Sequence, residues 1–330
     1  MTILVTGGAG YIGSHMVHAL VDRGLPVVVV DDLSTGYDAV LPADAALEVG
    51  DIGDEALIDR VIAEHGVTGI AHFAGSIVVP DSVVDPLGYY RNNTSNSRNL
   101  IAAAVRGGVQ AFLFSSTAAV YGEPATALID ETVQPAPVSP YGWSKLMTEV
   151  MLRDAGRAHG LRHAVLRYFN VAGADPKGRT GQSSPRATHL IKVASQAALG
   201  QRGHMEVFGA DYATRDGTGI RDYIHVTDLI DAHVLALTHL LEGGESLTAN
   251  CGYGAGFSVL EVVEAVKRVS GVDFDVRMAP RRAGDPAALV ADSARIRDLL
   301  GWRPAYADLD TIVGHAFAWE AALAKRNSKP

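Results

Sequence analysis

Short apolar segments alternate with longer amphipathic ones along the first half of the chain. The apolar segments predict strands at 2–6, 27–30, 47–49, 69–73, 111–114 and 163–167. The stretches between them predict helices, including a long one over 86–106 and another that begins at Ser139. This alternation of strand and helix indicates an α/β fold built on a doubly wound parallel sheet.

The second half of the chain has a different pattern. Residues 171–186 are rich in Gly, Pro, Ser and charged residues, which predicts a long irregular loop. Beyond the loop we expect strands at 206–209, 247–250 and 273–278, helices at 188–199, 227–241, 293–300 and 308–325, and a further helix capped by Ser258. We therefore expect a first domain over 1–170, with contributions from about 221–250, and a smaller mixed α/β lobe over 171–330.

Composition narrows the class of protein. The chain has 330 residues, 48% of them hydrophobic, which suffices for two domains or one large domain with a lobe. The net charge is −9 and the only short basic run is Lys325-Arg326, which argues against nucleic-acid binding. A single cysteine, Cys251, predicts no disulfide framework and no metal site. No cleavable signal and no membrane-spanning stretch is evident, so we expect a soluble cytoplasmic protein that binds no membrane.

A glycine-rich turn follows the first predicted strand. Gly8, Gly10 and Gly13 fit the pattern G-x-G-x-x-G, and Gly7 with Gly10 and Gly13 fits a wider form of it. The next strand ends in Asp31, as a dinucleotide site requires. Missing side chains let the backbone approach a pyrophosphate at the start of the following helix. Asp31 would bind ribose hydroxyls and repel a 2′-phosphate, which favours NAD over NADP; the alternative is an ordinary tight turn.

A tyrosine and a lysine lie four residues apart at the start of a predicted helix. Ser139 is a good cap and Pro140 suits the first turn, so Tyr141 and Lys145 would share one face. A nearby ammonium lowers the pKa of a phenol, which would prepare Tyr141 for proton exchange with a substrate hydroxyl. Such a pair on a helix is otherwise a solvated face. The glycine turn at the other end of the domain favours the catalytic interpretation.

Several of these segments together resemble the extended short-chain dehydrogenase/reductase family, and within it the epimerases of nucleotide sugars. The resemblance runs from the first strand to about Asp292 and is carried by GGAGYIGSH, HFAG, FSSTAAVYG, SPYGWSK, LRYFNVAGA, DGTGIRDYIHV and RRAGDP. It implies inversion of C4 of a UDP-sugar, UDP-glucose or UDP-galactose, by transient hydride transfer to bound NAD through a 4-keto intermediate. Relatives form homodimers through helices equivalent to 86–106 and 139–159.

The resemblance also implies a role for individual residues. Tyr141 would exchange the proton of the sugar 4-hydroxyl, Lys145 would lower its pKa and bind the nicotinamide ribose, and Thr117 would bind the sugar hydroxyl. NAD would contact the glycine turn and further residues: Gly7, Gly10, Tyr11, Ile12, Gly13, Asp31, Asp51, Ile52, Phe73, Ala74, Gly75, Asn92 and Phe169. The UDP-sugar would contact Asn170, His189, Val207, Phe208, Arg221, Arg282 and Asp285.

Alternatives remain for single residues. Asp51 and Ile52 could equally be an ordinary loop acid and a core aliphatic residue. A guanidinium can hold pyrophosphate oxygens with two parallel bonds, so we favour ligand roles for Arg221 and Arg282 and a surface salt bridge for Arg281.

Departures from the family pattern leave some properties open. Ile77 stands where many relatives have a lysine near the cofactor. Leu289 falls near the position that gates the sugar pocket, so acceptance of N-acetylated or pentose substrates stays open. A sugar-nucleotide dehydratase would need an acid and a base where this chain has Ala118-Ala119. A non-catalytic dinucleotide sensor would have no need of the Tyr141–Lys145 pair.

Overall fold

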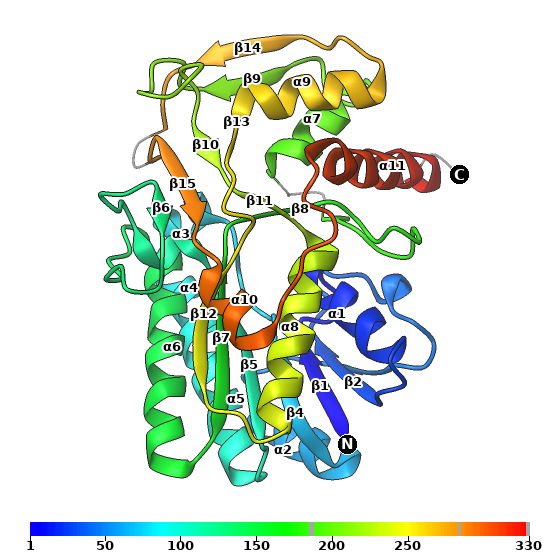
Figure 1. Cartoon of the computed structure of the whole chain (residues 1–330). Helices are drawn as coiled ribbons and strands as arrows, with labels where there is room; N and C mark the ends of the chain where they lie inside the picture. Colours follow the sequence, from blue (N-terminus) through cyan, green and yellow to red (C-terminus); the bar gives the residue numbers. More distant parts are fainter. Residues whose placement is uncertain (185–187, 283–284, 328–330) are drawn as a thin grey trace.

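The large parallel sheet predicted from the sequence is confirmed. The computed structural model describes residues 1–184, 188–282 and 285–327. Its largest sheet has seven parallel strands in the order β12-β7-β5-β4-β1-β2-β3 (Figure 1). These strands are β1 (Thr2–Thr6), β2 (Val27–Asp31), β3 (Ala46–Val49), β4 (Val67–His72), β5 (Ala111–Ser115), β7 (Arg162–Tyr168) and β12 (Leu247–Cys251).

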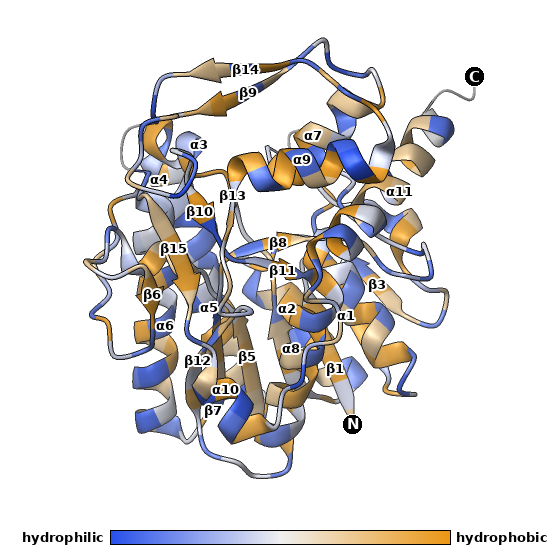
Figure 2. Cartoon of the chain, turned by 45° about the horizontal axis from the view of Figure 1, so that its top comes forward, coloured by the Kyte–Doolittle hydropathy of each residue, from blue (hydrophilic) through white to orange (hydrophobic). Residues whose placement is uncertain are grey.

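Helices cover both faces of this sheet because successive strand residues point to opposite sides. Ile3 and Val5 of β1 pack in the core that includes α1 (Tyr11–Val21) and α8 (Val226–Leu241). Leu4 packs on the other side, in the core that includes α2 (Glu55–His65), α5 (Asn96–Arg106) and α6 (Pro140–His159). Figure 2 shows these strands mostly in the hydrophobic colours, whereas α6 alternates between the two.

The helix predicted over 86–106 is confirmed, and its middle contains a π-helical turn that the sequence did not predict. The segment consists of α4 (Pro86–Tyr89), a π-helical stretch η2 (Tyr90–Ser95) and α5, and α3 (Val79–Val84) precedes it. A wider π turn re-aims the side chains that follow it and is often found at functional sites. Here it turns the adjacent asparagines Asn92 and Asn93 toward the loop that follows β4.

The smaller lobe is built on helices and short strands. Its core lies among α7 (Leu190–Ala198), α9 (Val259–Ser270) and α11 (Leu309–Asn327), next to β9 (Met205–Phe208), which pairs with β14 (Val276–Ala279). Ser258 caps α9 as predicted, through a reciprocal bond pair with Glu261. The strand predicted at 273–278 begins only at Val276.

Very short strands join the two parts of the molecule, and the sequence did not predict them. β10 (Ile220–Arg221) lies between β13 (Phe257–Ser258) and β15 (Ala288–Ala291), and β6 (Leu128–Ile129) pairs with β15. β11 (Tyr223–His225) pairs with β8 (Asn170–Ala172). Two to four residues are too few to show a period of two, so only tertiary packing reveals these strands. The residue limits of the two domains stay a prediction.

In the described part of the chain, no helix has the length and apolarity needed to cross a membrane. Residues 185–187, inside or just beyond the irregular loop expected at 171–186, and residues 283–284 of the RRAGDP segment lie outside the described residues.

Candidate functional site

The glycine turn forms a cradle that side chains could not occupy. Gly7 has φ +68°, and a Cβ atom on it would lie 2.6 Å from the backbone nitrogen of Ala74. A Cβ atom on Gly13 would lie 2.1 Å from the carbonyl oxygen of Gly7. Gly10 is the residue before α1, and no side chain caps this helix. The first backbone N–H groups of α1 are therefore free to bind a ligand. These features fit the pyrophosphate of a dinucleotide.

Asp31 lies beside this turn at the end of β2. Its carboxylate accepts hydrogen bonds from the amides of Ala9 and Leu33, both at 2.9 Å, and the side chain is buried. Burial raises the pKa of Asp31, and the two backbone bonds oppose that rise. Each oxygen keeps a further acceptor site, so the carboxylate can still receive ribose hydroxyls.

Two predicted adenine contacts have structural partners of their own. Asp51 is exposed and accepts from the amide of Gly53 and the side chain of Asn96, both at 2.8 Å. Ile52 is buried in the core between the sheet and α2. Both residues therefore fit the alternatives given above as well as a nucleotide site, and their binding role stays a prediction.

The loop after β4 lies against the start of α6. The amide of Phe73 donates to the carbonyl of Thr6 at 3.0 Å, which places Phe73, Ala74 and Gly75 next to the glycine turn. A Cβ atom on Gly75 would lie 3.7 Å from the ammonium of Lys145. The predicted cofactor contacts and the predicted catalytic lysine are therefore neighbours.

Asn93, which the sequence did not single out, holds this loop in place. Its side chain is buried, accepts from the amide of Ser76 at 2.8 Å and donates to the carbonyl of Ser76 at 2.9 Å. It also donates to the hydroxyl of Ser144 on α6 at 3.0 Å. Asn92 donates to the hydroxyl of Ser76 at 2.8 Å. The sequence did offer one signal for this role: Asn92 and Asn93 are poor helix formers, yet they lie inside a predicted helix.

The three predicted catalytic residues meet at the carboxyl edge of the sheet. Thr117 follows β5, and its hydroxyl accepts from the amide of Ala119 at 3.1 Å. Tyr141 lies in the first turn of α6, is buried, and shares a hydrogen bond with Thr117. Lys145 is buried one turn later; its ammonium donates to the carbonyl of Ser115 at 3.3 Å and lies 5.0 Å from the centre of the Phe114 ring.

One expectation about this group is wrong for the chain by itself. Burial raises the pKa of Tyr141 to about 12, and the hydrogen bond from Thr117 opposes the rise only in part. Burial likewise lowers the pKa of Lys145 to about 8, against the attraction of Glu149. Because both charged forms lose solvation here, desolvation sets the direction of both pKa shifts.

Predicted substrate residues gather on the strands of the small lobe and at the β8 junction. Arg221 on β10 forms an ion pair with Asp285 at 3.1 Å. The guanidinium of Arg282 lies 3.8 Å from the centre of the Phe208 ring. Val207 is buried, Asn170 is exposed at the start of β8, and His189 directly precedes α7.

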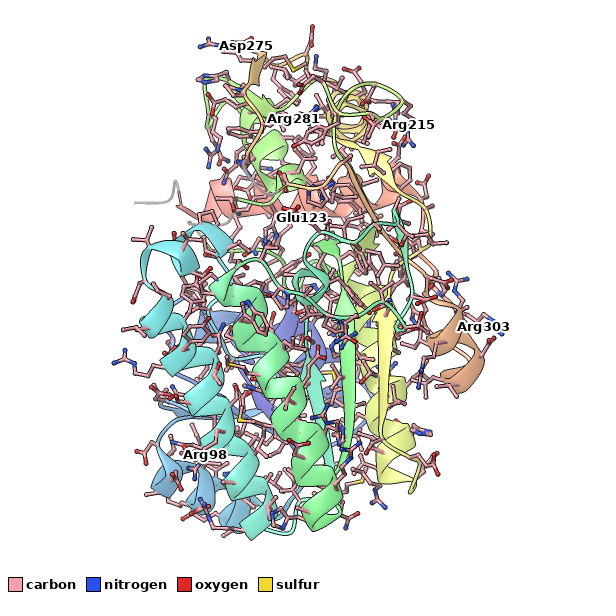
Figure 3. All side chains as sticks on the ribbon, turned by 90° about the vertical axis from the view of Figure 1, so that its left-hand side faces the viewer. Arg98, Glu123, Arg215, Asp275, Arg281 and Arg303 are labelled. Carbon is pink, nitrogen blue, oxygen red and sulfur yellow. The ribbon has the colours of Figure 1, made fainter. Side chains whose placement is uncertain are left out.

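Two further residues named in the sequence analysis have partners of their own. Leu289 pairs with Arg221 across β15 and β10, and it packs with Phe169 around Tyr121. Arg281, in the small lobe at the top of Figure 3, lies 4.1 Å from the Tyr212 ring centre and forms a 2.5 Å ion pair with Asp211. Arg281 therefore makes the surface contact expected of it.

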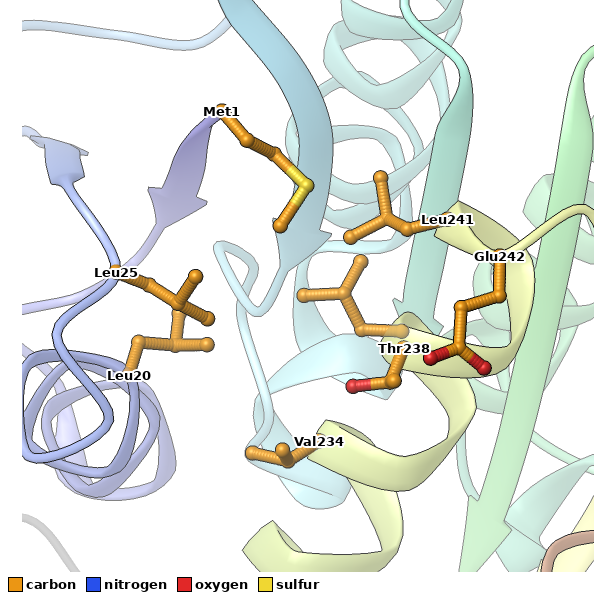
Figure 4. A pocket seen from close by; sticks show the side chains of 8 residues that line it. Met1, Leu20, Leu25, Val234, Thr238, Leu241 and Glu242 are labelled. Carbon is orange, nitrogen blue, oxygen red and sulfur yellow. The ribbon is translucent and has the colours of Figure 1, made fainter.

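A small apolar pocket between α1 and α8 lies elsewhere (Figure 4). It is lined by Met1, Leu20, Leu25, Val234, Leu237, Thr238, Leu241 and Glu242. Met1 precedes β1, whereas the glycine turn follows it, so the pocket is at the opposite edge of the sheet and separate from the site.

Comparison with known proteins agrees with this geometry. A family model described as the NAD dependent epimerase/dehydratase family matches residues 3–252. The chain belongs to this family. The resemblance inferred from the sequence is thereby confirmed.

Individual relatives carry narrower names. The chain is 60% identical to a UDP-glucose 4-epimerase of Azospirillum brasilense over 97% of this chain and 92% of that protein. It is 45% identical, with a TM-score of 0.94, to UDP-glucose 4-epimerase from Brucella ovis in complex with NAD, covering 96% and 97% of the two chains. It is 48% identical, with a TM-score of 0.85, to the UDP-Glc/GlcNAc 4-epimerase of Campylobacter jejuni, covering 97% and 99%.

Proposed function

We propose that this protein is a UDP-sugar 4-epimerase that interconverts UDP-glucose and UDP-galactose with bound NAD. The observation that carries the proposal is the buried group of Thr117, Tyr141 and Lys145 beside a glycine cradle. High identity to a UDP-glucose 4-epimerase over nearly the whole chain supports the choice of substrate.

The cofactor would lie along the carboxyl edge of the sheet. The glycine turn and the open amides of α1 would hold its pyrophosphate, and Asp31 the adenosine ribose. Gly75 and Lys145 would border the nicotinamide ribose. Bound NAD would take a hydride from sugar C4 and later return it.

The protein's own part in the reaction is proton transfer. Tyr141, as phenolate, would accept the proton of the 4-hydroxyl while Thr117 holds that hydroxyl, and would return the proton at the end. A phenol with a pKa of about 12 needs positive charge nearby before it can act as a base. Lys145 and the positive charge of the bound oxidised cofactor would both supply it.

Inversion requires the 4-keto sugar to present its opposite face. The UDP portion must therefore be held firmly while the sugar turns. Arg221 and Arg282 would bind the pyrophosphate. In the structure Arg221 contacts Asp285 and Arg282 contacts Phe208, and both arginines would exchange these contacts for the ligand. Leu289 would border the sugar.

A second candidate is a 4-epimerase of N-acetylhexosamine or pentose UDP-sugars. The relative from Campylobacter jejuni is named for both UDP-Glc and UDP-GlcNAc, and Leu289 is smaller than a bulky aromatic gate. Dehydration is disfavoured because Ala118 and Ala119 cannot act as acid or base. A purely sensing role would leave the buried Tyr141 and Lys145 without purpose, although burying them costs free energy.

We also propose a homodimer. An apolar surface, here called the α3/α6 face, exposes Val79, Val83, Val84, Leu87, Trp143, Met147 and Val150. Trp143, Met147 and Val150 are spaced four and three residues apart, so they share one side of α6. An exposed apolar surface of this kind marks an interaction site. A second copy of the chain is the partner that the family resemblance predicts.

The first test is a coupled assay for UDP-glucose formed from UDP-galactose by the NAD-loaded protein. Turnover supports the proposal, and its absence in folded, NAD-loaded protein would reject it. A panel of UDP-hexoses, UDP-N-acetylhexosamines and UDP-pentoses, analysed for products, separates the two candidate substrates.

A further inference from the structure

A buried carboxylate lies on α6 directly beyond the catalytic pair. Glu149 follows Lys145 by four residues and Tyr141 by eight, so all three side chains lie along one face of the helix. Only 8% of its surface is exposed. Its carboxylate accepts from the hydroxyl of Ser116 at 2.5 Å and from Nε and Nη2 of Arg167 at 3.1 and 2.5 Å.

Part of this arrangement is structural. Arg167 on β7 is buried and also donates to the phenol oxygen of Tyr121 at 3.0 Å. Tyr121 in turn donates to the side chain of Asn250 on β12 at 2.8 Å. A buried guanidinium needs an anionic partner, and Glu149 supplies it. That role alone would predict loss of stability on mutation and no specific effect on the reaction.

The bond to Ser116 gives the carboxylate a second role. Ser116 is fully buried and immediately precedes Thr117. Glu149 therefore ties the end of β5, which carries Thr117, to the helix that carries Tyr141. The hydrogen bond between Thr117 and Tyr141 depends on the relative position of these two elements.

The charge of the carboxylate gives it a third role. The charged or titratable groups that act on Lys145 are Glu149 on α6 and His72 on β4, and Arg167 on β7 pairs with Glu149. Burial and Lys145 together lower the pKa of His72 to about 3, so this imidazole is neutral. The carboxylate of Glu149 favours the ammonium form of Lys145 and so opposes the effect of burial on the pKa of Lys145.

We propose that Glu149 is a positioning residue for the reaction: through Ser116 it aligns Thr117 with Tyr141, and it places a carboxylate one helical turn beyond Lys145. This inference rests on the function proposed above. A residue that only stabilised the fold would leave the pH dependence of turnover unchanged.

Two substitutions separate the two effects. Glu149→Gln keeps the length of the side chain and removes its charge, so the alkaline limb of the pH–kcat profile should move down by about one pH unit. Glu149→Asp keeps the charge and shortens the reach to Ser116, so kcat should fall about tenfold while the alkaline limb stays in place. The wild-type protein, loaded with NAD and assayed from pH 6 to 10, is the reference.

The matched control is another buried ion pair. Glu320 on α11 is 5% exposed and pairs with Lys192 at 2.6 Å in the small lobe. Glu320→Gln should lower the unfolding midpoint in urea without moving the alkaline limb.

The outcomes are distinct. A shifted limb in Glu149→Gln, with an unshifted limb in Glu320→Gln, supports the inference. An unshifted limb with wild-type kcat overturns it and leaves the proposed function standing. If only Glu149→Asp folds, reduced kcat supports the inference and unreduced kcat overturns it. Lack of turnover by the wild-type protein rejects the proposed function itself.

Discussion

Substituting Gly7 by alanine tests the cradle most directly. Gly7 has φ +68°, and the new Cβ atom would lie 2.6, 2.8 and 2.9 Å from backbone atoms of Ala74 and Phe73. The nearest of these is 0.8 Å short of the 3.4 Å at which ordinary contact begins, since 3.4 − 2.6 = 0.8. Backbone atoms on a neighbouring strand end cannot rotate away as a flexible side chain can, so the glycine turn itself must move.

Gly24 supplies a matched control. It has nearly the same conformation, φ +72°, and a Cβ atom on it would meet nothing within 4 Å. Alanine in the left-handed region costs about 1–2 kcal/mol at either position. Gly7→Ala should cost a further 1–3 kcal/mol, roughly, for the overpacked contact with Ala74. The difference between the two variants therefore isolates the clash.

The displaced turn should also bind NAD less well. Losing one hydrogen bond to a charged pyrophosphate costs about 1.5–3 kcal/mol, which corresponds to roughly a tenfold to hundredfold lower affinity. Urea unfolding without NAD measures the first effect, and titration calorimetry with NAD measures the second. Equal stability and equal NAD affinity of Gly7→Ala and Gly24→Ala would refute the assignment of this turn as the pyrophosphate cradle.

Three further predictions concern other parts of the site and the surface. Tyr141→Phe should lower kcat at least about 100-fold with NAD still bound, because the proton acceptor is lost; wild-type turnover would exclude that role. Lys145→Met should abolish turnover yet stabilise the NAD-free protein by up to about 3 kcal/mol at pH 7, since burial depresses the pKa of Lys145 from 10.5 to about 8. Between these two pKa values the folded wild-type protein binds fewer protons than the unfolded protein, so the gain in stability should vanish as pH rises from 8 to 10.5. Urea unfolding at several pH values measures the gain, and a variant less stable than wild type at pH 7 would contradict the prediction. Val84→Asp on the α3/α6 face, where Val84 is 87% exposed, should shift the sedimentation of a dimer to that of a monomer, whereas Val49→Asp at the edge strand should not.

Local patterns in the sequence were sufficient for the main architecture. The buried strands, the glycine turn and the four-residue spacing of Tyr141 and Lys145 involve neighbours along the chain, so their period and composition predict them. The alternation of strand and helix predicted a parallel sheet, whereas the order of its strands came only from the structure. The helix over 86–106 was predicted, but its π turn was not, because Ser76 and Ser144, which bind Asn92 and Asn93 there, are distant in sequence.

Only the tertiary structure decided how segments that are distant in sequence contact one another. Strands as short as β10 and β15 have no pattern of their own and exist because Arg221 and Leu289 pair across them. The pKa of Tyr141 depends on burial, which no spacing reports. The link from Glu149 to Ser116 joins a helix to a strand end 33 residues away. The sequence by itself thus determined the chemistry that is carried by short segments, whereas folding determined the environment that sets how that chemistry works, because solvation and hydrogen bonding depend on which segments meet.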